Sequence, residues 1–171
     1  FMLVASMNPC PCGYFNHPEK SCVCGSNLVQ KYLSRISGPL LDRIDIHIEV
    51  TPVSFEELAS SRTTSEKSDA IRARVIAARE IQSKRYEHLQ EVYCNAQMPS
   101  NKIKQICAID ETGKQLLKTA INKLNLSARA YDRILKVSRT IADLDASEGI
   151  KTQHLAEAIH YRSLVRENWG G

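Results

Sequence analysis

The sequence predicts a mainly α-helical chain that begins with the remnant of an α/β core and continues as a helical bundle. Three observations support this. Residues 1–7 and 44–50 read as short buried or half-buried strands. Four cysteines lie close together between them. From about residue 66, apolar side chains recur at helical spacing. We therefore expect a first domain over residues 1–60, with a Cys-rich insertion at residues 10–24, and an α-helical domain over residues 61–171.

Composition narrows the class of protein more than it identifies a function. Of the 171 residues, 43% are hydrophobic and 25% charged, which is typical of a globular chain and not of a disordered one. No apolar run approaches the roughly 18 residues of a membrane span, so no membrane partner is expected. The net charge of +4 permits contact with nucleic acid or nucleotide phosphates without arguing for it.

The chain opens with Phe1 and an apolar run, not with Met and a basic region followed by a longer apolar stretch. A secretory signal is therefore not expected, and the cytoplasm is the predicted location. We expect this chain to be part of a larger protein, cut inside a buried strand.

A residue of interest adjoins each predicted strand. The first ends at Asn8-Pro9, and in open α/β sheets ligands bind at the carboxyl ends of strands, although Asn-Pro also favours a simple turn. A helix is expected at about residues 28–36, before Gly38-Pro39. Arg43 then lies on the turn into the second strand, where a structural ion pair is the alternative to a functional role.

The helical part shows start and stop signals. A polar, Ser/Thr-rich linker at residues 51–63 is followed by a long helix at about 66–90, whose charged side chains are expected to face solvent or, alternatively, DNA. Its expected apolar stripe is Ile71, Val75, Ala78, Ile81 and Leu89. Pro99-Ser100 is expected to start a short helix that ends at about Cys107, and Asp110, Ser127 and Thr152 are expected N-caps of the three helices that follow. Expected helix ends are Asn125, in a left-handed conformation, and Gly149. Gly170-Gly171 is expected to be a frayed end.

Four of the six cysteines form a candidate metal site: Cys10, Cys12, Cys22 and Cys24. In a cytoplasmic protein, clustered thiols indicate a metal before disulfides, and four thiolates suit a structural Zn²⁺. The Cys-x-Cys spacing is tighter than the usual Cys-x2-Cys of zinc knuckles, so reduced, metal-free thiols and a disulfide pair stay open as alternatives. His17 is a substitute ligand.

Three motifs together resemble the Mg-chelatase-like branch of the AAA+ ATPases, of the ComM/YifB type linked to competence. They are residues 3–13 (LVASMNPCPCG), residues 36–45 (ISGPLLDRID) and residues 126–135 (LSARAYDRIL). The resemblance spans nearly the whole chain and corresponds to the C-terminal third of such a protein. It implies the end of an AAA+ α/β core followed by the helical lid. The phosphate-binding loop GxxxxGK[ST] does not occur in this sequence, so this chain is expected to be inactive alone.

The resemblance also implies roles for individual residues. Asn8 matches sensor 1, which orients the attacking water. Arg43 matches the arginine finger that enters the neighbouring subunit's ATP site, with Arg35 as the runner-up. Arg129 matches sensor 2, with Arg133 as the runner-up. Arginine suits these roles because its planar, permanently charged fork matches phosphate oxygens.

The implied function is a ring-forming ATPase, a hexamer, that uses ATP and Mg²⁺ to remodel DNA, as in ComM-like branch migration. The Cys-rich insertion is then expected to touch DNA. Two alternatives remain from the sequence: a non-catalytic, zinc-dependent nucleic-acid-binding module, in which the arginines are incidental, and a chelatase-type assembly subunit.

Overall fold

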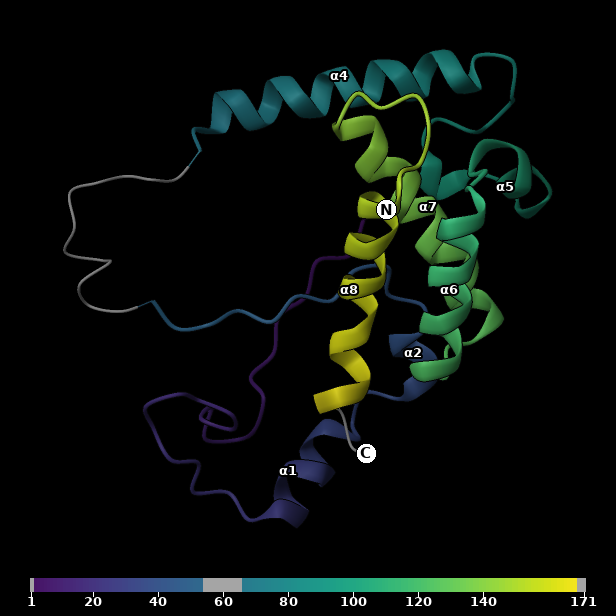
Figure 1. Ribbon diagram of the computed structural model, residues 1–171. Coiled ribbons are helices and arrows are strands. Elements are labelled where there is room, and N and C mark those ends of the chain that lie inside the picture. Colours follow the sequence, from purple (N-terminus) through teal and green to yellow (C-terminus); the bar gives the residue numbers. More distant parts are fainter. Residues whose placement is uncertain (1, 54–65, 169–171) are drawn as a thin grey trace.

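The computed structural model describes residues 2–53 and 66–168, with side chains up to residue 162. These residues form seven α-helices and one 3₁₀ helix (Figure 1). The prediction of a mainly α-helical chain is therefore confirmed for the part that is described. The expected domain boundary at residues 60–61, most of the predicted 51–63 linker and Gly170-Gly171 lie outside the described residues.

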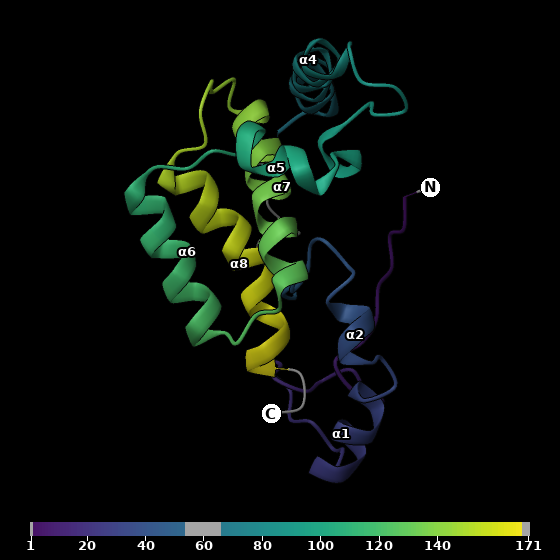
Figure 2. The ribbon, with the colours of Figure 1, turned by 90° about the vertical axis from the view of Figure 1, so that its right-hand side faces the viewer.

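The N-terminal part contains two short helices and a loop rich in cysteine. Helix α1 spans Ser26–Leu33 and α2 spans Gly38–Leu41, where Ser37 precedes a first turn that contains Pro39. Val29 and Leu33 on α1 pack against Cys10 in a small core of their own. In Figure 2, α1 and α2 lie apart from the larger bundle formed by α6, α7 and α8.

The two predicted strands are not formed. Residues 2–7 and 45–50 belong to no strand in the described structure, and their apolar side chains are exposed, with Val4 at 83% and Val50 at 87%. A strand needs a neighbour that pairs with its N–H and C=O groups. Among the described residues, the second segment makes one backbone–backbone hydrogen bond to a helix, from His47 N to Tyr161 O at 3.1 Å. The expected burial of these apolar side chains is therefore wrong as well, because neither segment pairs with another strand among the described residues.

The helical domain consists of one long helix and a bundle beneath it. Helix α4 spans Ser68–Tyr86 and crosses one end of the bundle, so it is seen end-on in Figure 2. The other helices are η1 (Asn95–Gln97), α5 (Ser100–Ile106), α6 (Glu111–Lys123), α7 (Ala128–Leu144) and α8 (Thr152–Asn168). Helix α7 is central, because it packs against α8, α4, α5 and η1.

The main hydrophobic core fills the space between these helices, and its centre is aliphatic. Ile103, Leu117, Ile134 and Leu155 are almost completely buried there. Leu155 and Ala158 face inward on α8, as the sequence predicted. No helix within the described residues is both long enough and apolar enough to span a bilayer.

Helix ends in this domain follow the predicted chemistry closely. Asp110 accepts a hydrogen bond from Gly113 N at 2.7 Å, and Ser127 accepts one from Ala130 N at 3.2 Å, so both predicted N-caps are confirmed. Asn125 has φ of +46° and lets Leu126 N bond back to Ile121 O at 3.0 Å. This is the Schellman arrangement that ends a helix with a left-handed residue.

Two other predicted ends were misplaced. Helix α7 ends at Leu144, before Gly149, because Ala146 adopts φ of +49° and Ser147 N bonds back to Ala142 O at 2.8 Å. The left-handed position is thus filled by Ala, where glycine is usual. Thr152 is the first residue of α8 and not its N-cap.

The predicted face of α4 is only partly buried. Ala78, Gln82 and Tyr86 are buried, whereas Ile71 and Val75 remain 42% and 43% exposed. The reason is that only the C-terminal half of α4 overlies the bundle, as Figure 1 shows.

A buried polar network joins α4, η1 and α7. The carboxylate of Asp143 is fully buried and accepts hydrogen bonds from Arg85 Nη1 and Nη2 at 2.6 and 2.5 Å. It also accepts bonds from Arg139 Nε at 3.1 Å and Asn95 Nδ2 at 2.8 Å. Arg85 was expected on a solvated face, and this pairing corrects that expectation. One carboxylate therefore balances two guanidinium groups inside the domain.

Candidate functional site

An open groove of about 590 Å³ runs along α7 and is bordered by α8 and by the segment 45–48. Arg129, in the first turn of α7, lines it together with Arg133 and Lys136, one and two turns further along. Arg129 is exposed, and the backbone N–H groups at a helix start also favour an anion. The carboxylates of Asp45, Asp132 and Glu157 also line the groove, so the case for a phosphate group depends on Arg129 and the start of α7.

The segment that follows α2 is fastened to the helical domain by three side chains. Arg162 of α8, almost completely buried, donates to the backbone oxygens of Ile44 and Asp42. Arg133 of α7 forms an ion pair with Asp45. His47 Nδ1 lies 3.3 Å from Tyr161 O, and His47 N donates to the same oxygen. Residues 42–47 are thus held against α7 and α8.

His47 is a neutral group in this contact. Desolvation, followed by the charge of Arg162, lowers its pKa below 6.5. Its Nε2 atom is buried without a hydrogen-bond partner among the described residues. A protonated ring would place a positive charge next to Arg162, and the nearby carboxylate of Asp45 offsets this only in part, so the neutral form fits this contact.

Arg43 and Asn8 lie outside the groove. Arg43 is exposed at the end of α2, and its Nη1 donates to Pro39 O at 2.7 Å, so its guanidinium folds back over its own helix. Asn8 is exposed in the N-terminal segment. Of the three residues predicted for the nucleotide site, only Arg129 lines the groove, and the structure does not bring the three together.

The runner-up arginines are both engaged. Arg133 is paired with Asp45, and the guanidinium of Arg35 lies 5.9 Å from the ring centre of Tyr32. Sequence reasoning missed Arg162 altogether. The available signal was an arginine at position i+4 from Ala158 on the predicted inward face of the last helix, which indicates a buried charge in need of a partner.

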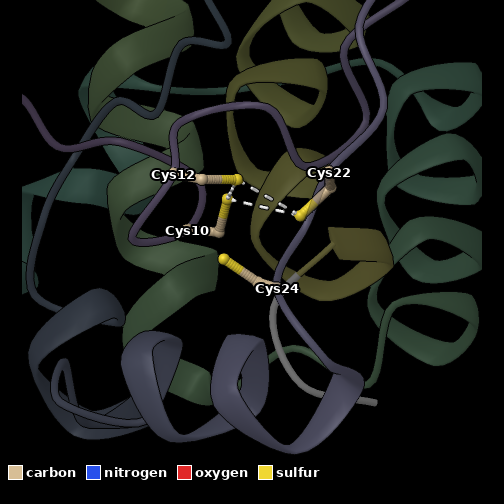
Figure 3. A group of neighbouring side chains, drawn as sticks. All are labelled: Cys10, Cys12, Cys22 and Cys24. Carbon is tan, nitrogen blue, oxygen red and sulfur yellow. Dashed lines mark hydrogen bonds between the residues drawn. The ribbon is translucent and has the colours of Figure 1, made fainter.

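The four clustered cysteines converge on one point (Figure 3). The Sγ atoms of Cys10 and Cys12 are 3.3 Å apart, and both are close to Cys22 Sγ, at 3.7 and 3.5 Å. With Cys24, all four Sγ atoms lie within 4.8 Å of one another. None of them forms a disulfide. The structure therefore brings the predicted metal ligands together.

The cysteine environment favours one thiolate at neutral pH. A backbone hydrogen bond at Tyr14 lowers the pKa of Cys12 to about 6. A backbone hydrogen bond at Cys24 also acts on Cys22, but desolvation and the neighbouring thiols outweigh it and raise the pKa of Cys22 to about 12. His17 is not part of this cluster, because its Nδ1 accepts the backbone N–H groups of Glu19 and Lys20, both at 3.1 Å.

Comparison with known proteins places this arrangement in a family. Residues 65–162 match the family described as magnesium chelatase, subunit ChlI C-terminal, and residues 1–58 match magnesium chelatase, subunit ChlI. The chain is 42% identical over 166 residues to the competence protein ComM of Haemophilus influenzae and 40% identical to the protein YifB of Escherichia coli. Each match covers 97% of this chain and 31% of the relative, so the chain spans about a third of their length.

These matches include all three motifs that carried the resemblance, and the helical domain coincides with the larger matched region. The chain therefore belongs to the magnesium chelatase ChlI family and, within it, to the Mg-chelatase-like AAA+ ATPases related to ComM and YifB.

Proposed function

We propose that this chain is the C-terminal part of a ring-forming AAA+ ATPase that couples ATP hydrolysis to DNA remodelling. Residues 1–60 contribute the end of its α/β core and residues 61–171 its lid. The ring is a hexamer of identical subunits in the cytoplasm, and its action resembles branch migration. The name of the relative ComM, a competence protein, supports a role with DNA taken up by cells.

The observation that carries the proposal is the placement of Arg129. It stands exposed at the start of α7, in a groove that Arg133 and Lys136 line together with three carboxylates, those of Asp45, Asp132 and Glu157. In this proposal, Arg129 binds phosphate oxygens within its own subunit. Arg43, exposed at the end of α2, reaches the site of the neighbouring subunit after its bond to Pro39 O opens. Asn8 positions the attacking water.

ATP and Mg²⁺ are the cofactors of the longer protein in this proposal, and they supply the phosphoryl group and its charge compensation. The residues described here fit one part of that site only. Arg129 and the α7 N-terminus suit phosphate, whereas the GxxxxGK[ST] loop does not occur in these 171 residues. Hydrolysis by this chain alone is therefore not expected.

The test is ATP hydrolysis by the full-length protein, with and without branched DNA. Arg43→Ala should lower turnover by about 10²-fold or more while ATP binding persists, since arginine fingers contribute about 10³–10⁵ in related systems. Mixing with subunits that carry an intact finger should restore activity. Arg129→Ala should act within its own subunit and show no such rescue. Arg72→Ala, on the exposed face of α4, is the matched control and should be silent.

Equal rescue of the Arg43 and Arg129 variants would show that the two roles are wrongly assigned. ATP turnover that is indifferent to every form of DNA would contradict DNA remodelling while leaving the ATPase intact.

A second candidate function is a zinc-dependent nucleic-acid-binding module. The observation in its favour is the convergence of the four thiols in a loop that lies to one side of the bundle in Figure 1. DNA binding by this 171-residue chain that depends on zinc and is unaffected by Arg43→Ala and Arg129→Ala would favour it over the ATPase.

A further inference from the structure

The loop that carries the four cysteines has little else to hold it in place. Residues 2–25 contain no helix or strand in the described structure. The buried part of their core consists of Cys10, Val29 and Leu33, and the side chains packed around it include the other three cysteines. Such a small apolar core does not offset the conformational entropy of a loop of this length. The thiols therefore occupy the position that hydrophobic side chains hold in larger domains.

The spacing of the sulfur atoms matches a single tetrahedral metal ion. Zinc–sulfur bonds are about 2.3 Å, which places the four sulfurs of a tetrahedron about 3.8 Å apart. The three separations among Cys10, Cys12 and Cys22 are 3.3, 3.5 and 3.7 Å, and no pair that includes Cys24 exceeds 4.8 Å. Disulfide sulfurs are closer, at about 2.05 Å. The arrangement thus needs only small movements to surround one ion.

The donor set narrows the choice of metal. Four thiolates in tetrahedral geometry select Zn²⁺ or iron over Mg²⁺ and Ca²⁺, which prefer oxygen ligands. An iron–sulfur cluster binds its thiolates to different iron atoms and so holds them further apart than one ion does. With all four positions supplied by the protein, no position stays open for water or substrate, so the ion has a structural role.

We propose that Cys10, Cys12, Cys22 and Cys24 bind one Zn²⁺, and that this ion folds residues 9–33 into a unit whose stability is separate from that of the helical domain. The inference depends on the thiols alone, so it holds for either candidate function. The loop packs on α1 through Val29 and Leu33, and backbone bonds extend the end of α1 as far as Ile36, whose N–H donates to Leu33 O. Metal binding is therefore expected to order the loop together with α1.

The first test is the metal content of the whole 171-residue chain, purified under reducing conditions without chelator. We expect about one zinc per chain. Cys22→Ser should lower zinc retention by roughly tenfold or more, since it removes a ligand outright. Cys94→Ser is the matched control, because Cys94 is a free thiol outside the cluster that contacts Gln97. It should retain the full zinc content.

The second test measures the coordination geometry of the bound metal and the amide protection of the loop, whereas the first measures the zinc content. Replacing zinc by Co²⁺ should give the d–d and sulfur-to-cobalt bands of a tetrahedral thiolate site, and Cys24→Ser should weaken them. On chelation, amide protection should fall in residues 9–33 and stay constant in α6, α7 and α8. This comparison separates loss of metal from global unfolding.

Zinc-free protein that shows no tetrahedral cobalt spectrum would overturn the proposal, and so would iron as the bound metal. Equal zinc content in the Cys22 and Cys94 variants would have the same consequence. Loss of protection across the helical bundle on chelation would refute the separate stability of the loop.

Discussion

Asp143 is the residue whose loss should damage the helical domain most through charge alone. Its buried carboxylate accepts two hydrogen bonds from Arg85, one from Arg139 and one from Asn95. Asp143→Asn keeps the shape of the side chain but removes the negative charge. Two guanidinium groups would then share the interior with no counter-charge from this position. Arg139 is the more affected of the two, because its side chain is almost fully buried.

The magnitude follows from the cost of an unpaired buried charge. Removing one partner of a buried ion pair costs about 3–5 kcal/mol. Arg85 keeps part of its side chain in water, so the lower part of that range applies, about 3–4 kcal/mol. For a domain of this size, each kcal/mol lowers Tm by about 4–8 °C, so we expect a decrease of about 12–32 °C.

The assay is urea and thermal unfolding of the 171-residue chain, followed by helical circular dichroism. Glu66→Gln is the matched control, because Glu66 also pairs with an arginine, Arg74, through both of its carboxylate oxygens, but in a solvent-exposed position. That control should change the free energy of unfolding by less than about 1 kcal/mol. If Asp143→Asn also costs less than about 1 kcal/mol, the reasoning from an uncompensated buried charge is wrong.

Other changes should have smaller and more local effects. Ala146→Gly should stabilise the domain by about 1 kcal/mol in urea unfolding, because Ala146 has φ of +49°, where a Cβ atom is strained. Ser127→Ala should cost about 1 kcal/mol by the same measurement, because it removes the cap of α7. Burial raises the pKa of Cys107 from 9.0 to about 11, so its thiol should resist labelling at pH 8 until urea unfolds the chain. The unfolded chain loses this proton first, so the contribution of Cys107 to stability should fall as pH rises from about 9 to 11. Hydrogen exchange should be fast in residues 2–7, whose described backbone forms no strand, and slow in α7.

Helix caps, which depend on nearby residues, were predicted well from the sequence, whereas strand pairing, which depends on distant residues, was not. Asp110, Ser127 and Asn125 were identified because capping depends on residues three or four positions away. The strands failed because a strand is defined by its partner, which an apolar pattern in one segment does not supply. Gly149 was predicted to end the helix because glycine carries no penalty in the left-handed region, but the structure places Ala146 in that region, where a Cβ atom is disfavoured.

The same difference between nearby and distant residues applies to the candidate sites. The cysteine cluster was predicted from spacing alone, because its members lie within fifteen residues and a short loop can bring them together. The contacts of Arg162 with residues 42–44 join positions more than a hundred residues apart, and no local pattern indicates them. The same holds for the pairing of Arg85 with Asp143, where the charge periodicity of α4 favoured solvent exposure.

Arg162 of α8 holds the turn at residues 42–44 against the helical domain, directly before the apolar segment 45–50. Its guanidinium donates to the backbone oxygens of Asp42 and Ile44, and the Asp42 carboxylate, with Oδ1 3.8 Å from Arg162 Nη2, adds an ion pair to this contact. If α8 tilted, the turn at residues 42–44 would move with it. Arg43 would move as well, because it lies between the two residues that Arg162 contacts. Under the proposed function, a nucleotide sensed at the start of α7 in one subunit would thereby be reported at the boundary with the next, without any part of the helical domain having to unfold.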